Sequence, residues 1–304
     1  MTTKTTTTDT DGTDEGATQA RSASDFGLRD GLADISDQIG LHILLVVTLA
    51  VISAPIVLAI LFSTQSASQI LNIGGIGFGS EAVNNYWTVL TEYGFGRYIM
   101  TTAIVAVATA IGKVTVSLLA GLAIVYYDVP FKRGLFLLLL LTLMLPVPVR
   151  IVPLYELMIR LGWQDTLLAL IVPALASPTA LLVLRQKFRS IPTSLVENAR
   201  LDGVGPIRFL FKVLLPMSRG MIVGLLGIAF IWGWNQYLWP LIVISSEQKQ
   251  VIQVGISQLQ GSVAAGRPLW GLIMAGTVLA LVPPLLVMIG LHRPLLKTFN
   301  YQTQ

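Results

Sequence analysis

The sequence predicts an all-α membrane protein with six transmembrane helices and a helix-turn-helix loop on the cytoplasmic side. The 304 residues are 54% hydrophobic and only 12% charged, whereas soluble domains carry about 25% charged residues. Mean hydropathy is +0.73, and the apolar residues gather in long runs with few charges, as membrane-spanning helices require. Because the chain contains no cysteine, disulfides, thiolate metal sites and cysteine nucleophiles are excluded.

The apolar runs define two regions of the chain. Residues 1–40 are rich in Thr, Asp, Gly and Ser and cannot bury enough surface to fold, so we expect a flexible acidic tail. Residues 41–304 form the membrane domain. Its first run, 41–62, corresponds to about 33 Å of helix, enough for a hydrocarbon core of about 30 Å. The expected spans lie near residues 41–62, 98–126, 135–149, 165–184, 220–244 and 269–291.

The small residues, the one charge and the prolines inside the expected spans predict how these spans pack and where they bend. The run 98–126 is dense in Ala, Thr, Ser and Gly, which predicts a helix that faces other helices. Its one internal charge, Lys113, indicates either a pathway residue or a cation that snorkels or pairs at the bundle edge. We expect a short connection at 150–164 and polar loops at 63–96, 185–219 and 245–268. Three spans contain proline pairs: we expect Pro146 and Pro148 to interrupt the end of the third, Pro173 and Pro178 to break the fourth, and Pro283 and Pro284 to kink the sixth.

The distribution of Lys and Arg predicts the orientation. The loops after the second and fourth expected spans and the C-terminal end carry more than twice as many basic residues as the remaining loops. By the positive-inside rule these segments lie in the cytoplasm, and with six spans both termini do as well. The basic balance therefore reflects a multi-pass protein of the cell membrane, surrounded by lipid, and not a nucleic-acid-binding protein.

The segment 191–216, IPTSLVENARLDGVGPIRFLFKVLLP, predicts two short helices joined by a sharp turn. Ser194 and Glu197 fit a capping box, Gly203 fits a left-handed helix end, and Pro206 suits the first turn of the next helix, 206–214. Neither helix is long enough to cross a bilayer. A small amphipathic helix of this kind suits a groove on a cytosolic partner, although helix capping alone also accounts for Glu197 and Gly203.

This segment resembles the EAA loop of binding-protein-dependent ABC importer permeases. In that pattern Glu-Ala-Ala is followed at fixed spacing by Gly and by Ile-x-Leu-Pro, and here Asn198 and Val213 replace an Ala and the Ile. The residues of interest within this stretch are Glu197, Asn198, Ala199, Asp202, Gly203 and Pro216. The resemblance implies that these residues couple the permease to a partner ATPase, with Glu197, Ala199 and Gly203 as contact and hinge residues.

The resemblance extends over about residues 40–300 and favours the carbohydrate-type branch, through 143–146 (LMLP), 153–155 (PLY) and 234–241 (WNQYLWPL). Within it, 112–117 (GKVTVS), 141–151 (LTLMLPVPVRI) and 233–240 (GWNQYLWP) are similar to the second permease of glycerol-3-phosphate importers. The resemblance implies a heterodimer with a second permease subunit, two ATP-binding subunits and an extracytoplasmic solute-binding protein. The chain itself is expected to be a non-catalytic subunit that binds no cofactor or metal. It lacks a phosphate-binding loop, so it is not expected to bind ATP; ATP and Mg would bind to the partner ATPase.

The expected solute is sn-glycerol-3-phosphate, and the alternative is a sugar or oligosaccharide of the maltose or trehalose type. Candidate pathway residues are Lys113, Thr115, Asn235 and Gln236; hydrogen bonding between helices is an alternative role for the last two. An ion-coupled secondary transporter would need acids or a histidine relay at membrane depth, and an intramembrane enzyme would need a catalytic cluster. The sequence offers neither.

Overall fold

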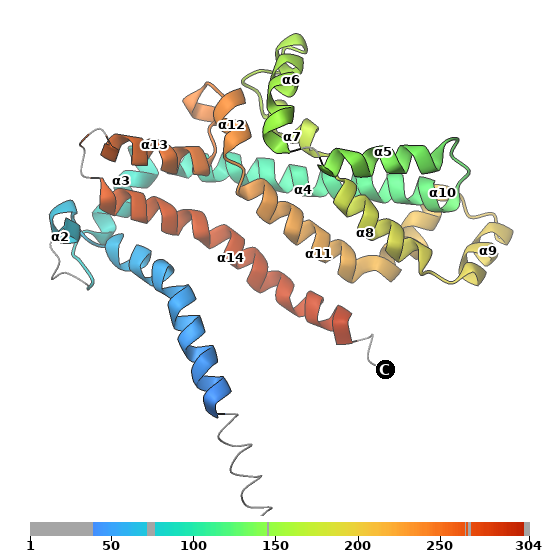
Figure 1. Cartoon of the computed structure of the whole chain (residues 1–304), viewed down its shortest axis with the longest axis horizontal. Helices are drawn as coiled ribbons and strands as arrows, with labels where there is room; N and C mark the ends of the chain where they lie inside the picture. The colour runs from blue at the N-terminus through green and yellow to red at the C-terminus, as the bar shows by residue number, and fades with distance from the viewer. Residues whose placement is uncertain (1–38, 72–76, 145, 265, 267–268, 301–304) are drawn as a thin grey trace, which may run out of the picture. The chain divides into compact units, whose positions relative to one another are not determined.

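A computed structural model describes residues 39–71, 77–144, 146–264, 266 and 269–300, and the regular secondary structure of these residues is helical (Figure 1). The expected tail at 1–40 lies outside the described residues except for its last two. The chain divides into two units, 1–58 and 59–304. The boundary between the two units falls within the helix Ile39–Phe62. The apolar side chains of this helix are largely exposed, as expected for a helix that is surrounded by lipid.

Within the described part of the chain, four helices are long and apolar enough to cross a membrane, and a bent helix pair adds a fifth candidate. The four are Ile39–Phe62, Phe95–Tyr126 (α4), Pro206–Trp234 and Trp270–Leu291, the last being part of α14, Trp270–Asn300. At about 1.5 Å per residue, each exceeds the hydrocarbon core of about 30 Å. The structure therefore establishes a multi-helix membrane protein.

Helix α4 is the centre of the 59–304 unit, as its small residues predicted. It packs against α8 (Pro178–Arg189) and α11 (Leu215–Trp234), and 44% of its most apolar window is buried, the largest share among the four long helices. Helices α4 and α11 approach closely at Gly233, where an added Cβ would lie 3.1 Å from the Cα of Ala106. Small residues at this crossing let the two backbones approach. In lipid, where no hydrophobic effect drives helices together, such close van der Waals packing stabilises their association.

The structure corrects the region of the third expected span. Helix α5 covers only Lys132–Met144, about 20 Å, and a second helix, α6 (Val147–Arg160), follows Pro146. The prediction of a short connection at 150–164 was wrong. Leu154 and Met158 lie four residues apart on one helix face and pack into an apolar cluster with α7 and α12, so burial of that face stabilises a helix there.

The fourth expected span is broken where its prolines predicted. It consists of α7 (Leu167–Ile171), a 3₁₀ turn Val172–Ala174, and α8, with a bend of 41° between the two halves. The hydroxyls of Thr166 and Ser177 accept hydrogen bonds from the Ala169 and Ala180 amides. Each half-helix therefore begins with its own side-chain cap.

The fifth expected span begins earlier and ends earlier than 220–244. Helix α10 (Pro206–Phe209) passes through a π-helical turn, Leu210–Leu214, directly into α11. The prediction that 206–214 is a separate short helix was therefore wrong. Pro216 has no amide hydrogen for the Lys212 carbonyl, and the wider π turn accommodates its ring without ending the helix.

Helix α11 ends at Trp234, where the Asn235 side-chain amide donates to the Ile231 carbonyl at 2.9 Å and satisfies the helix end. A separate helix, α12 (Leu238–Val243), follows.

Two of the three expected polar loops, 63–96 and 245–268, contain helices that pack on the long helices. Residues 63–96 include α2 (Ala67–Leu71) and α3 (Ala82–Thr91), and residues 245–268 include a 3₁₀ turn (Glu247–Lys249) and α13 (Ile252–Ala264). Helix α3 packs on α14, and α13 packs on both α14 and α4. Helix α14 continues without a break through Pro283 and Pro284.

Candidate functional site

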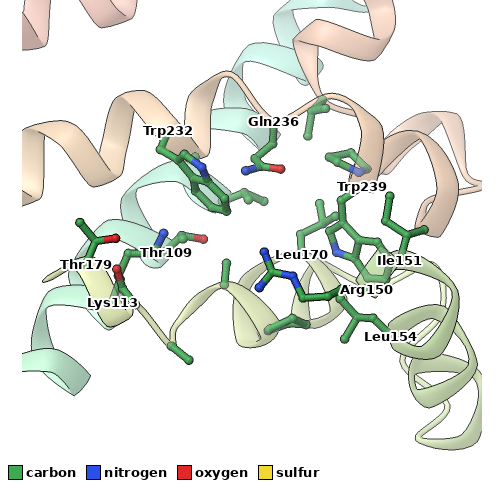
Figure 2. A pocket seen from close by; sticks show the side chains of 18 of the residues that line it. Thr109, Lys113, Arg150, Ile151, Leu154, Leu170, Thr179, Trp232, Gln236 and Trp239 are labelled. Carbon is green, nitrogen blue, oxygen red and sulfur yellow. The ribbon is translucent and has the colours of Figure 1, made fainter. Parts of the chain in front are cut away.

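A cavity of about 280 Å³ lies among α4, α6, the α7–α8 break, α11 and α12 (Figure 2). The break in the fourth span creates part of its wall, because Pro173, Ala174 and Ala176 lie there instead of a continuous helix. Its polar lining residues are Thr109, Lys113, Arg150, Ser177, Thr179 and Gln236. Two cations and no carboxylate are therefore present among the described residues of the lining.

Lys113 is almost fully buried, with 9% of its surface exposed. Its Nζ lies 3.7 Å from the ring centroid of Trp232, a cation–π contact. Within the described part of the chain Lys113 has no salt bridge, the two that occur being Lys132–Asp128 and Lys249–Asp165. A buried ammonium facing an aromatic ring without a counter-ion is costly, which favours a functional role over simple pairing.

Arg150 reaches the same cavity from α6. Figure 2 shows its guanidinium and the Gln236 amide turned toward the space below the indole of Trp232. The indole of Trp239 forms part of the opposite wall, where its Nε1 donates to the Ala169 carbonyl at 2.9 Å. The cavity therefore combines a cationic side with rigid aromatic walls.

The structure brings two of the four predicted pathway residues to the cavity, Lys113 and Gln236. Thr115 is exposed. It follows Lys113 by two residues, which turns its side chain through about 200° around the helix axis, away from the buried face that carries Lys113. Asn235 caps α11 and accepts from Gln253 Nε2 at 3.3 Å. Arg150 was missed, because its segment was predicted to be a connection; the helical spacing of Leu154 and Met158 after it was the signal available.

A second feature, the helix-turn-helix at 191–216, lies at one end of the 59–304 unit. Helix α9 spans Thr193–Leu201. The turn after it is a Schellman motif: the Gly203 amide donates to the Arg200 carbonyl at 3.0 Å and the Val204 amide to the Ala199 carbonyl at 2.9 Å. Gly203 has φ +66°, so the predicted left-handed helix end is confirmed, as is Pro206 in the first turn of α10. The capping box was wrong, since Pro192 is the N-cap and Ser194 lies inside α9.

The predicted coupling residues face different ways. Glu197, Asn198, Asp202, Gly203 and Pro216 are exposed. In contrast, Ala199 is half-buried and packs on the apolar cluster that holds α4, α8 and α10 together.

Two side chains fix α9 to the end of α4. The Arg200 guanidinium donates to the Tyr126 carbonyl at 2.9 Å. The Tyr126 hydroxyl donates to the Phe188 carbonyl at 2.6 Å, and its ring meets Phe209 edge-on. Sequence reasoning missed Arg200 and Tyr126. Their roles depend on contacts between segments about 74 residues apart, as the sequence separation of the hydrogen bond records.

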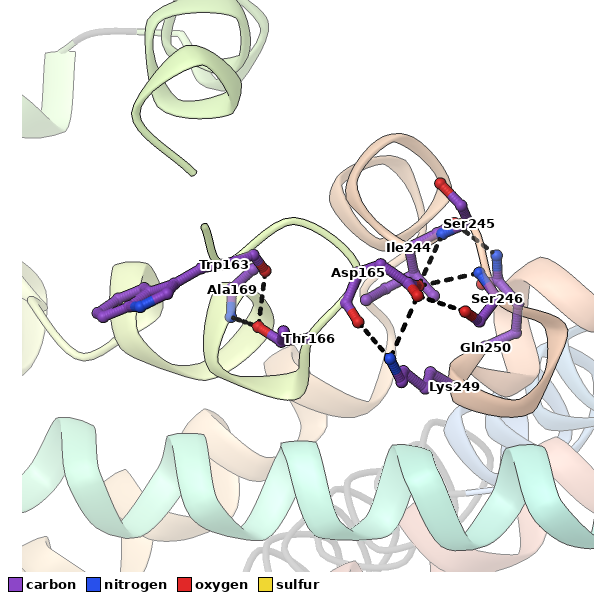
Figure 3. A network of polar contacts seen from close by, with 9 residues as sticks. All are labelled: Trp163, Asp165, Thr166, Ala169, Ile244, Ser245, Ser246, Lys249 and Gln250. Carbon is purple, nitrogen blue, oxygen red and sulfur yellow. Dashed lines mark hydrogen bonds and ion pairs between the residues drawn. The ribbon is translucent and has the colours of Figure 1, made fainter. Parts of the chain in front are cut away.

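A third feature is a cluster of polar contacts between the α6–α7 turn and the segment after α12 (Figure 3). One Asp165 carboxylate oxygen accepts from the amides of Ser245 and Ser246 at 3.1 and 2.9 Å. The other accepts from the Ser246 hydroxyl and from Lys249 Nζ, which lies 3.2 Å away. The hydrogen bonds from Ser246, and then those from Lys249 and Ser245, hold the pKa of Asp165 well below its usual range.

Replacing Asp165 with asparagine is expected to lower the thermal denaturation midpoint at pH 7. The depressed pKa means that the folded protein favours the carboxylate, so this contribution is complete above the ordinary aspartate pKa of about 4 and declines as pH falls below it. The difference in midpoint between the wild type and Asp165→Asn should therefore be smaller at pH 3 than at pH 7. A difference that stays constant over this range would contradict the role of the charge.

Comparison with known proteins identifies the family. The model of a family described as "Binding-protein-dependent transport system inner membrane component" matches residues 113–297, more than half of the chain. The chain belongs to this family. It is a multi-pass membrane component of a transport system and not an enzyme, and the described residues contain no cluster of His, Cys, Asp and Glu suited to a metal ion.

Named relatives of this permease point to one transport system. This chain is 36% identical over 260 residues to the sn-glycerol-3-phosphate transport system permease protein UgpE of Agrobacterium fabrum. The alignment covers 83% of this chain and 92% of the relative. The protein of the same name from Pectobacterium atrosepticum is 41% identical over 199 residues, or 66% of this chain and 70% of the relative.

A solved structure shares the fold of this permease. It is the crystal structure of a bacterial ABC transporter involved in the import of the acidic polysaccharide alginate, with a TM-score of 0.75 and 18% identity. The match covers 86% of this chain and 97% of the other. At this identity the likeness establishes the architecture alone.

Proposed function

We propose that this permease forms half of the transmembrane pathway for uptake of sn-glycerol-3-phosphate. The observation that carries the proposal is a cavity among α4, α6, the α7–α8 break, α11 and α12 that presents Lys113 and Arg150 and, among its described lining residues, no carboxylate. Such a lining attracts an anion and disfavours a cation. The names of relatives that match over 92% and 70% of their length support the same solute.

A sugar or oligosaccharide is the second candidate, and the aromatic walls favour it. Trp232 and Trp239 offer flat apolar faces in the cavity, which suit ligand recognition in general. A neutral sugar, however, leaves the two cations unexplained. An ion-coupled transporter is less consistent with the cavity, because the described lining contains no acid that could carry a proton or sodium ion.

The proposed topology has six spans, with both termini, the acidic tail 1–40 and α9 on the cytoplasmic side. The hydrogen bond between Tyr126 and the Phe188 carbonyl supports it, because the ends of α4 and α8 must then lie at the same side of the bundle. The chain between them has to cross and return. The bent pair α7–α8 is the span that brings the chain back to the side where α4 ends. The span that leads away from that side, the third, is then formed by α5 and its neighbours.

The proposed coupling element is α9 with the turn at Gly203. Glu197 and Leu201 are exposed on α9, Leu201 at 86%, and Ile207 in the following helix α10 is 55% exposed. Exposed apolar side chains beside a charged one are typical of helices that dock into a groove. Glu197 has no ion pair within the described residues. Two ATP-binding subunits that bind ATP and Mg²⁺ would dock here, while a second permease completes the pathway and a solute-binding protein delivers solute to the opposite face.

In this mechanism, closure of the ATPase pair moves α9 as a unit. The Schellman turn and the Arg200–Tyr126 hydrogen bond connect α9 to α4 and to the Pro206–Trp234 helix. Both helices line the cavity, through Lys113 and Trp232. Movement at the cytoplasmic end can therefore change which side of the membrane the cavity opens toward, a population shift between two states.

The proposal is tested by uptake of labelled glycerol-3-phosphate into cells with this gene deleted and into cells complemented with it. We expect uptake to be lost on deletion and restored by complementation, without competition by unlabelled maltose or trehalose. Unchanged glycerol-3-phosphate uptake after deletion, or competition by either sugar, would move the solute to the sugar class. Co-purification with an ATP-binding subunit tests the coupling part independently.

A further inference from the structure

We propose that Lys113, Arg150 and Thr109 form a binding subsite for the phosphate group of a phosphate ester. The inference deepens the proposed function, because it assigns the anionic part of the solute to particular residues of this chain. It rests on three groups that come from two separate helices, α4 and α6, and line one cavity.

The first observation is the arrangement around Lys113. Its ammonium is buried against the indole of Trp232, 3.7 Å from the ring centroid. A cation–π contact compensates only part of the cost of removing an ammonium from water. An anion entering the cavity would supply the missing counter-charge. It would also find the Lys113 side chain already held in position, so that little conformational entropy is lost on binding.

The second observation is an unpaired hydroxyl. Thr109 is 1% exposed, and its Oγ1 has no hydrogen-bond partner among the described residues. Thr109 and Lys113 are one helical turn apart, so both side chains lie on the same face of α4. A buried hydroxyl without a partner costs free energy unless a ligand or water satisfies it. A phosphate oxygen beside Lys113 would accept its hydrogen bond.

The third observation is the position of Arg150 on a different helix, facing the same space (Figure 2). A guanidinium donates two parallel hydrogen bonds to a phosphate, which fixes the orientation of the group. Lys113 contributes a point charge from α4 and Arg150 contributes the directional contact from α6. A phosphate bound by both would therefore bridge α4 and α6.

The size of the cavity limits the rest of the solute. At about 280 Å³, it lies near the lower end of ligand cavities, which range over about 300–1,000 Å³. A phosphate with a three-carbon polyol matches this size better than an oligosaccharide does. Ser177, Thr179 and Gln236 line the remaining wall and provide hydrogen-bonding groups for hydroxyls.

The test measures the KM and the maximal rate of glycerol-3-phosphate uptake in the complete transporter carrying Lys113→Gln, Arg150→Gln or Thr109→Val. We expect either charge substitution to raise KM by at least about tenfold, since each removes a charge-assisted contact, and Lys113→Arg to restore part of the loss. The control is Arg160→Gln, on the same helix as Arg150 but outside the cavity lining, which should leave KM unchanged.

A binding measurement separates this inference from the proposed function. Thermal stabilisation of the purified transporter is compared for glycerol-3-phosphate, inorganic phosphate and glycerol, in the wild type and in Arg150→Gln. Arg150 is exposed, so its substitution should leave folding intact even if Lys113→Gln fails to accumulate.

Three results would discriminate between the claims. Wild-type KM values in both charge variants, with glycerol-3-phosphate uptake intact, would overturn the subsite and leave the proposed function standing. Absence of glycerol-3-phosphate uptake in the wild type, together with Arg150-dependent stabilisation by phosphate but not by glycerol, would overturn the proposed solute and support the subsite. Stabilisation by phosphate that Arg150→Gln does not reduce would overturn the subsite.

Discussion

Replacing Gly203 with valine is expected to abolish uptake while the chain still reaches the membrane. Gly203 has φ +66° and no atom lies within 4 Å of an added Cβ, so the obstacle is backbone conformation and not space. The left-handed region costs an L-residue about 1–2 kcal/mol, and a β-branched side chain is a genuine outlier there. The turn would then adopt another conformation, and the outward face of α9 would no longer be presented in its present orientation.

Two substitutions serve as controls for Gly203→Val. Asparagine tolerates the left-handed conformation, so Gly203→Asn should retain most of the uptake. Gly205 also has open space around it but has φ −67°, so Gly205→Val should be tolerated by the backbone. The measurements are uptake, the amount of chain in the membrane, and retention of the ATP-binding subunit on purification. Equal uptake by Gly203→Val and Gly203→Asn would contradict a conformational role for this turn.

Replacing Trp234 with alanine is expected to have the largest effect on stability, about 3–5 kcal/mol for truncation of a buried aromatic side chain. Trp234 is fully buried, stacks on Phe230, and donates from its indole to the Ala280 carbonyl at 3.0 Å. That carbonyl lies four residues before Pro284, which has no amide hydrogen to offer it. The Trp234 indole therefore satisfies a group that the proline leaves unpaired, as helices in lipid require.

Neighbouring substitutions separate these contributions. Trp234→Phe keeps most of the buried ring but removes the hydrogen bond, so it should lose less stability than Trp234→Ala. Trp232→Ala removes an equally large ring from a half-exposed position at the cavity. It should lose less stability than either variant at Trp234. The midpoint temperature for loss of monodisperse protein in detergent gives the ranking. A Trp232→Ala variant less stable than Trp234→Ala would show that burial and the Ala280 contact do not control stability.

The class of fold and the local features follow from the order and type of the residues. Apolar runs identified the helices at 39–62, 95–126 and 270–291 to within a few residues, because exposure to lipid requires nearly continuous apolar composition. The break near Pro173 and Pro178 and the left-handed conformation of Gly203 also followed from the sequence, because proline and glycine act on their own backbone.

Features that depend on contacts between distant segments arise only when the helices pack. Helix α6 forms because one of its faces is buried against α7 and α12, and this places Arg150 in the lining of the same cavity as Lys113. Composition could not distinguish Lys113 from Thr115 as a cavity residue, since only the packing around α4 determines which face is buried. Likewise, the Ala280 carbonyl is satisfied by an indole 46 residues earlier in the chain. Local propensity specifies helices and turns, whereas the site arises from side chains that only packing brings together.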